Sequence, residues 1–160
     1  MAWILSAVLK VGNGLHIVAG VSLVFLMLLT LADVVLRACG TPIPGTYELV
    51  GYAGGIAIGL AMPVTSWRRG HVYVDTFLAW LPRAVRTAVH LGTRLVGAGL
   101  FAVLAWNLVR FGLDLRASGE VSLTLELKYY PVAFGLATAS TVQAVVLLCH
   151  IELVRRGEYE

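Results

Sequence analysis

The sequence predicts an all-α membrane protein in which four apolar helices cross the bilayer. Of its 160 residues, 59% are hydrophobic and only 13% are charged, whereas a soluble protein typically has about 25% charged residues. Four apolar stretches are each close to the roughly 20 residues that cross a hydrocarbon core. Short polar segments separate them and leave no room for a soluble domain, so we expect residues 1–160 to form a single integral membrane domain.

The predicted spans end where charge or proline interrupts an apolar run. Two prolines in residues 40–45 cannot continue a helix, so the first span stops near Arg37. The second stops at Arg68 and Arg69, which cannot enter hydrocarbon cheaply. A hydrophilic segment, residues 110–128, separates the last two spans. The predicted spans are residues 16–36, 49–67, 88–109 and 129–151.

A short amphipathic helix is predicted between the second and third spans, at residues 73–81. This segment is too polar to cross the bilayer and too apolar for an ordinary loop. Its apolar residues recur at i, i+3, i+4 and i+7, which is typical of a helix lying in the membrane plane. Pro82 ends it. These apolar residues are Val74, Phe77, Leu78 and Leu81.

The distribution of basic residues predicts the orientation. Positive charge is normally retained on the cytoplasmic side of a membrane. The larger group lies on the side that holds the two chain ends, so we expect both termini in the cytoplasm. One side would hold Lys10, Arg68, Arg69, Arg83, Arg86, Arg94, Arg155 and Arg156, and the other Arg37, Arg110, Arg116 and Lys128.

Three charged residues flank the loop between the first two spans. Asp33 and Arg37 stand one helical turn apart and can form an i,i+4 ion pair. Glu48 opens the second span, about ten residues further on, and could join them in one cluster. Such a cluster would fix the hairpin at headgroup depth, dock a periplasmic partner or brace another subunit.

The second span carries a row of glycines at Gly51, Gly55 and Gly59. Because they recur every fourth residue, they share one helix face. Small residues let another helix approach closely in a membrane. We therefore expect this face to pack within the bundle or against another subunit.

The segment after the second span holds the densest polar cluster of the chain, with Arg69, Gly70, His71 and Asp75. His71 and Asp75 stand at i,i+4 if a helix begins early enough there. A metal would need more ligands than this pair supplies. We interpret these residues as fixing a turn at the membrane edge.

The sequence offers little chemistry of its own. No nucleophile motif or phosphate-binding glycine loop is present, so we predict no enzymatic activity and no cofactor. Basic residues lie singly or in pairs at span ends, which excludes a nucleic-acid surface. The spans also lack an ionisable group near mid-membrane, as an ion-translocating protein would have.

One alternative is a haem-binding membrane anchor of a quinone-linked oxidoreductase. His16, His90 and His150 all lie near the cytoplasmic ends of predicted spans, and two imidazoles at one depth can ligate haem. Histidine is also frequent at interfaces, where its tip reaches water. A self-contained small exporter acting as a dimer is a second alternative.

Several short motifs together resemble the small membrane subunit of tripartite ATP-independent periplasmic (TRAP) transporters. The resemblance spans nearly the whole chain, and the basic-Gly-His motif is its most specific part. The approach to the last span, residues 124–131, departs from the family pattern. The matching motifs are Asp33-Val34-Val35-Leu36-Arg37, Pro44-Gly45-Thr46-Tyr47-Glu48, residues 69–75 and Pro82-Arg83.

The resemblance implies a helper subunit (Q-type) in the bacterial inner membrane. In such systems a periplasmic substrate-binding protein delivers an organic acid, such as a dicarboxylate or a sugar acid, to a large membrane subunit that imports it with sodium. The small subunit supports the large one and contacts phospholipid. Arg37 and Glu48 match the family's charged positions beside the first outer loop. Residues 69–71 and Asp75 match its inner-loop motif, with roles in loop geometry and subunit contacts.

Overall fold

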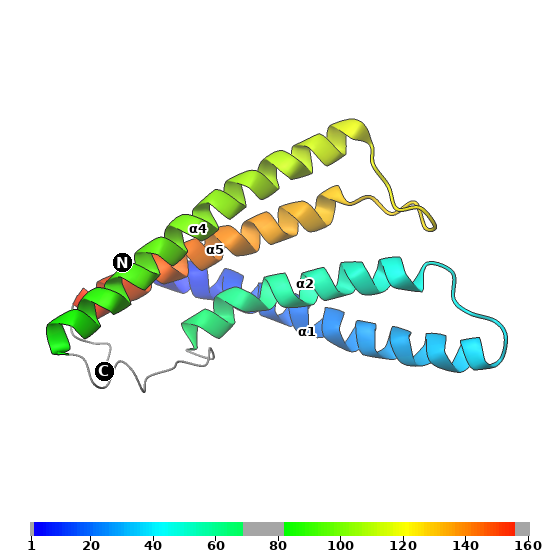
Figure 1. Cartoon of the computed structure of the whole chain (residues 1–160), viewed down its shortest axis with the longest axis horizontal. Helices are drawn as coiled ribbons and strands as arrows, with labels where there is room; N and C mark the ends of the chain where they lie inside the picture. The colour runs from blue at the N-terminus through cyan, green and yellow to red at the C-terminus, as the bar shows by residue number, and fades with distance from the viewer. Residues whose placement is uncertain (1, 69–81, 156–160) are drawn as a thin grey trace.

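The computed structural model describes residues 2–68 and 82–155, which form four long helices (Figure 1). All four are long and apolar enough to cross a membrane, and no strand occurs in the described ranges, so the all-α prediction with four spans is confirmed. The predicted in-plane helix at 73–81 lies outside the described residues. The helices are α1 (Ala2–Ala38), α2 (Thr46–Trp67), α4 (Arg83–Ser118) and α5 (Tyr130–Arg155).

Two of the helices extend well beyond the predicted spans. α1 has 37 residues and α4 has 36, and at 1.5 Å per residue each is about 54 Å long. They must therefore tilt strongly or project from a hydrocarbon core about 30 Å thick. The first nine residues of the hydrophilic segment 110–128 are helical, because polar side chains do not stop a helix. Gly119 ends the helix: it has a φ of 71° and donates its N–H to the Leu115 carbonyl.

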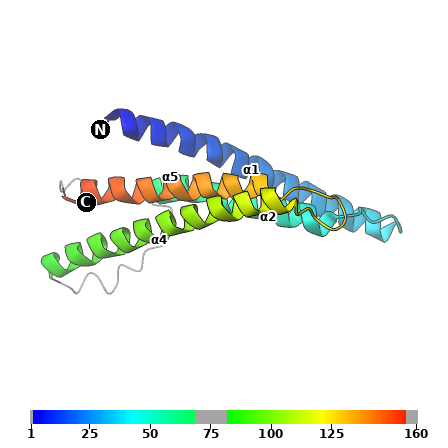
Figure 2. The same cartoon turned by 90° about the horizontal axis from the view of Figure 1, so that it is seen from above.

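The helices form two antiparallel hairpins, α1 with α2 and α4 with α5 (Figure 1). α5 packs against α2 and joins the hairpins, while α1 and α4 lie on the outside of this pair (Figure 2). We call the end with the connecting segments 39–45 and 119–129 the loop end. The opposite end, where α1 begins and α5 finishes, is the terminal end.

Alanine dominates the interior where the helices meet. Ala19 of α1, Leu60 of α2 and Ala139 of α5 form one buried cluster. Without a large hydrophobic driving force between helices in lipid, close backbone approach and van der Waals contact hold such interfaces together. The buried alanines are Ala19, Ala53, Ala57, Ala98, Ala105, Ala133, Ala137, Ala139 and Ala144.

Candidate functional site

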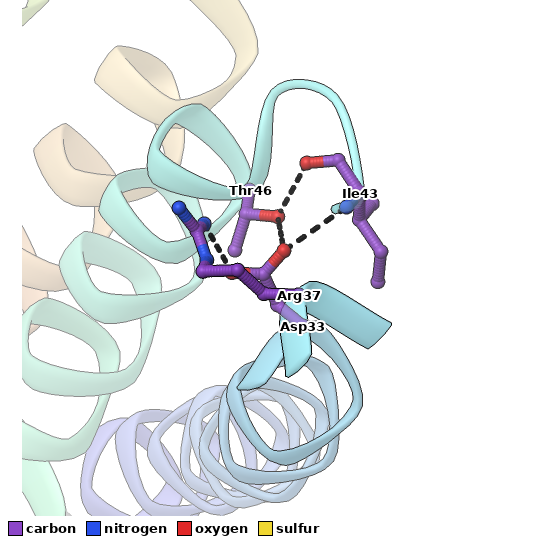
Figure 3. A network of polar contacts seen from close by, with 4 residues as sticks. All are labelled: Asp33, Arg37, Ile43 and Thr46. Carbon is purple, nitrogen blue, oxygen red and sulfur yellow. Dashed lines mark hydrogen bonds and ion pairs between the residues drawn. The ribbon is translucent and has the colours of Figure 1, made fainter. Parts of the chain in front are cut away.

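The loop between α1 and α2 is organised by the carboxylate of Asp33 (Figure 3). Its Oδ2 accepts a hydrogen bond from Arg37 Nη2 at 2.6 Å, and this contact is the predicted i,i+4 ion pair. Its Oδ1 accepts from the Ile43 backbone N–H at 3.0 Å and from Thr46 Oγ1 at 3.1 Å. The single Thr46 hydroxyl proton is shared with the Ile43 carbonyl, whose oxygen lies 2.8 Å from Oγ1. We call these four residues the Asp33 cluster.

The Asp33 cluster ties the last turn of α1 to the first residue of α2. Asp33 is 6% exposed, so its carboxylate needs these three donors to replace water. Arg37 keeps about half of its side chain exposed, and the ion pair is therefore the least protected of the contacts. The arrangement fixes the angle at which the chain leaves α1 and starts α2.

Glu48 does not join this cluster but organises the other connecting segment. Its carboxylate accepts hydrogen bonds from Ser122 Oγ at 2.7 Å, the Thr124 N–H at 2.7 Å and the Leu125 N–H at 3.0 Å. We call these residues the Glu48 cluster. The predicted three-member arrangement is thus divided: Asp33 with Arg37 closes the first hairpin, and Glu48 links the two hairpins.

Segment 119–129 is folded around the same link. Ser122 accepts from the Leu127 N–H through its hydroxyl and donates its own N–H to the Leu127 carbonyl. Tyr52 of α2 donates its hydroxyl to that carbonyl at 3.1 Å, and its ring stacks on Tyr129 at 5.2 Å. The segment is therefore held against the start of α2 by side chains and backbone together.

Gly45, in the connecting segment of the first hairpin, lies against Leu125 of the other connecting segment. Its φ of 74° is a left-handed conformation, and a Cβ there would overlap the side chain of Leu125. Both the backbone conformation and the contact with Leu125 favour glycine at this position. Tyr47 and Leu123, by contrast, extend away from the protein, with 82% and 100% of their surface exposed.

The glycine row of α2 meets different surroundings along its length. A Cβ at Gly59 would overlap the Leu136 side chain of α5, so the two helices are in close contact there. A Cβ at Gly51 or Gly55 would meet nothing within 4 Å. The buried small residues of α2 are instead Ala53 and Ala57. The row thus packs closely at one end and opens toward the loop end.

The predicted inner-loop residues Arg69, Gly70, His71 and Asp75 lie outside the described residues. The structure does describe a polar cluster near the terminal end that sequence reasoning missed. Gln143 of α5 donates its amide to Ser66 of α2 at 2.7 Å, and His150 stacks on Trp67 at 5.3 Å. Arg94 of α4 is also buried, at 7% exposure.

A sequence signal existed for the burial of both polar residues, because Gln143 interrupts the apolar α5 and Arg94 lies inside the span-length α4. The stack on Trp67 occupies one face of the His150 ring, whereas His16 is exposed on α1. Among the described residues, no group of three His, Cys, Asp or Glu side chains could hold a metal ion. The contacts described at the loop end and in this cluster join one helix to another or to a connecting segment.

The fold and these contacts define a multi-pass membrane protein built from two linked helical hairpins. Residues 26–156 match the family described as tripartite ATP-independent periplasmic transporters, DctQ component. The match covers most of the chain, including both connecting segments, so the protein belongs to this family. A comparison with curated proteins found no match.

Membership makes the chain the small membrane subunit of a TRAP transporter. Subunits of this family associate in general with a large membrane subunit and a substrate-binding protein. The family is a transporter component and not an enzyme family.

Proposed function

We propose that this chain is the scaffold subunit of a sodium-coupled TRAP importer of organic acids such as dicarboxylates or sugar acids. The family match over residues 26–156 is the observation that carries the proposal. The scaffold would hold the static part of the large subunit while its transport part moves. Substrate and sodium would bind to the partner subunits.

The two clusters at the loop end support a mechanical role. A helper that resists tilting must not hinge between its own hairpins. The Asp33 cluster fixes α1 against α2, and the Glu48 cluster fixes α2 against segment 119–129. We propose that Asp33, Arg37 and Glu48 are structural in this sense. We further propose that Gly59 allows α2 to lie close to α5, whereas Gly51 and Gly55 leave the α2 face open toward the loop end.

The proposed topology has the loop end in the periplasm and both termini in the cytoplasm of the bacterial inner membrane. In this orientation Leu123, fully exposed on segment 119–129, faces the compartment of the substrate-binding protein. Arg69, Gly70, His71 and Asp75 would then face the cytoplasm and hold the inner loop. Exposed apolar side chains on α1 and α4 suit contact with phospholipid or with the large subunit.

Co-purification tests the proposal. The tagged chain is extracted from its native membrane in mild detergent, its partners are identified by mass spectrometry, and a visible spectrum is recorded. A much larger polytopic subunit without a haem band is expected. Sodium-dependent uptake of an organic acid should then require both membrane subunits. Recovery of soluble dehydrogenase subunits with a haem band would contradict the proposal.

A paired substitution tests the proposed periplasmic contact. Leu123→Ser removes the exposed side chain and should weaken capture of the substrate-binding protein without changing recovery of the large subunit. Glu126→Gln alters an exposed residue of the same segment and provides the control. If the two variants capture the binding protein equally, Leu123 is not the contact.

A further inference from the structure

Two apolar grooves flank the start of α5 at the loop end. The larger, about 350 Å³, lies between α4 and α5, and the smaller, about 240 Å³, lies between α2 and α5. Tyr129 and Val132 line both, so the grooves lie on either side of the first turn of α5. The larger groove is further lined by Leu108, Phe111, Leu115, Glu120, Ala133 and Leu136, and the smaller by Glu48, Gly51 and Tyr52.

Each groove has a charged rim and an apolar wall. Glu120 follows the end of α4, and Glu48 lies in the first turn of α2, so both carboxylates are at the loop end. Leu136, on the wall, lies about 9 Å further into the span than Tyr130 by the rise of an α-helix. The polarity therefore changes from charged to apolar in the direction in which a lipid lies in a bilayer.

We propose that these grooves bind one phospholipid with an ammonium headgroup, such as phosphatidylethanolamine. Its two acyl chains would occupy the two grooves on either side of Val132, with the headgroup above Tyr129. Two neighbouring grooves that share Tyr129 and Val132 fit a two-chained molecule better than a single helix. Each groove is also far larger than the roughly 30 Å³ occupied by one water molecule.

Charge complementarity selects the headgroup. The only charged side chains that line the described grooves are the carboxylates of Glu48 and Glu120. An ammonium group is attracted to them, whereas the headgroup of phosphatidylglycerol adds no positive charge. The three hydrogen bonds that Glu48 accepts from segment 119–129 preserve its negative charge at the rim.

Lipid titration followed by native mass spectrometry tests the proposal on the full chain in mild detergent. The probes are dioleoyl phosphatidylethanolamine and dioleoyl phosphatidylglycerol, which have identical acyl chains. The wild type should retain phosphatidylethanolamine about threefold more strongly, as expected for one partly exposed ion pair. Glu120→Gln should remove most of this preference, and Glu126→Gln, which changes an exposed carboxylate elsewhere on the segment, should retain it.

Gly51→Leu fills the smaller groove and should reduce retention of both lipids. Gly99→Leu is its matched control, since a Cβ at Gly51 or at Gly99 meets nothing within 4 Å and both variants should fold. Equal retention by these two variants would overturn the proposal, and so would equal binding of the two lipids by the wild type. The proposal would also fail if Gly51→Leu left lipid binding intact but blocked recovery of the large subunit, because a partner helix would then occupy the groove. The lipid readout does not depend on the proposed transport function.

Discussion

The Glu48 carboxylate of α2 accepts a hydrogen bond from the Ser122 hydroxyl at 2.7 Å, across 74 positions of sequence. This contact joins the first hairpin to the segment that connects α4 and α5. Two backbone N–H groups of the same segment donate to the same carboxylate. One side chain therefore fixes how the two hairpins meet at the loop end.

Removing that carboxylate should loosen the loop end. Glu48→Ala removes all three hydrogen bonds and leaves the Ser122 hydroxyl and two backbone N–H groups without the carboxylate as their acceptor. The distribution of distances between the two hairpins should therefore broaden. Glu48→Gln retains a neutral acceptor and should have a smaller effect. Spin labels at the exposed positions Tyr47 and Leu123, in a chain whose two cysteines are replaced, report this distance by electron paramagnetic resonance. Unchanged distance distributions in Glu48→Ala would show that helix packing alone sets the arrangement.

The Asp33 cluster should depend more on the carboxylate than on the ion pair. Asp33→Ala removes the acceptor of the Ile43 N–H and of the Arg37 guanidinium and leaves the Thr46 hydroxyl only the Ile43 carbonyl, so it should give the largest fall in melting temperature in detergent. Arg37→Ala should give the smallest, because Arg37 is half exposed and Asp33 keeps two donors. The loss of melting temperature in Asp33→Asn should lie between the losses in these two variants. Equal losses for Arg37→Ala and Asp33→Ala would mean that the ion pair dominates.

The contacts that the sequence predicts are local. Asp33 and Arg37 stand at i,i+4, and helix geometry alone places them side by side. Glu48 and Ser122 are too distant in sequence for any periodicity to pair them. The nearby charge of Arg37 made a cluster of Glu48 with Asp33 and Arg37 plausible. Instead, the Glu48 carboxylate accepts its hydrogen bonds from the Ser122 hydroxyl and two backbone N–H groups of segment 119–129. Such loop geometry depends on tertiary contacts that composition does not encode.

Helix ends were similarly difficult to infer. Hydropathy identifies the part of a helix that lies in hydrocarbon, but the hydrogen-bonded helix can extend past it. α4 continues through Arg110 and Asp114 to Ser118 because only Gly119 supplies a stop. The burial of Gln143 against Ser66 could not be read from either helix alone, because it depends on how α2 and α5 face each other.

Gly45 should tolerate alanine less well than Gly40. Both have left-handed backbones, with φ of 74° and 81°, and an L-residue in that conformation costs roughly 1–2 kcal/mol. Only Gly45 also faces Leu125, whose side chain a new Cβ would overlap, while a Cβ at Gly40 meets nothing within 4 Å. Gly45→Ala should therefore lower stability by more than Gly40→Ala in chemical unfolding from detergent micelles. Similar losses would indicate that Leu125 moves aside freely.

The contact between Gly59 and Leu136 should be necessary for α2 to approach α5. Gly59→Leu places a side chain where Leu136 lies and should destabilise the isolated chain by about 1–3 kcal/mol, the usual cost of overpacking. Gly55→Leu, one turn away with no neighbour within 4 Å of its Cβ, should cost much less. Because the clash is with one side chain, the double variant Gly59→Leu with Leu136→Ala should recover part of the loss. Unfolding measurements on the wild type, Gly59→Leu, Leu136→Ala and the double variant give the coupling between the two positions. A recovery of zero would mean that α2 is displaced as a whole and that the Leu136 side chain does not set the helix separation.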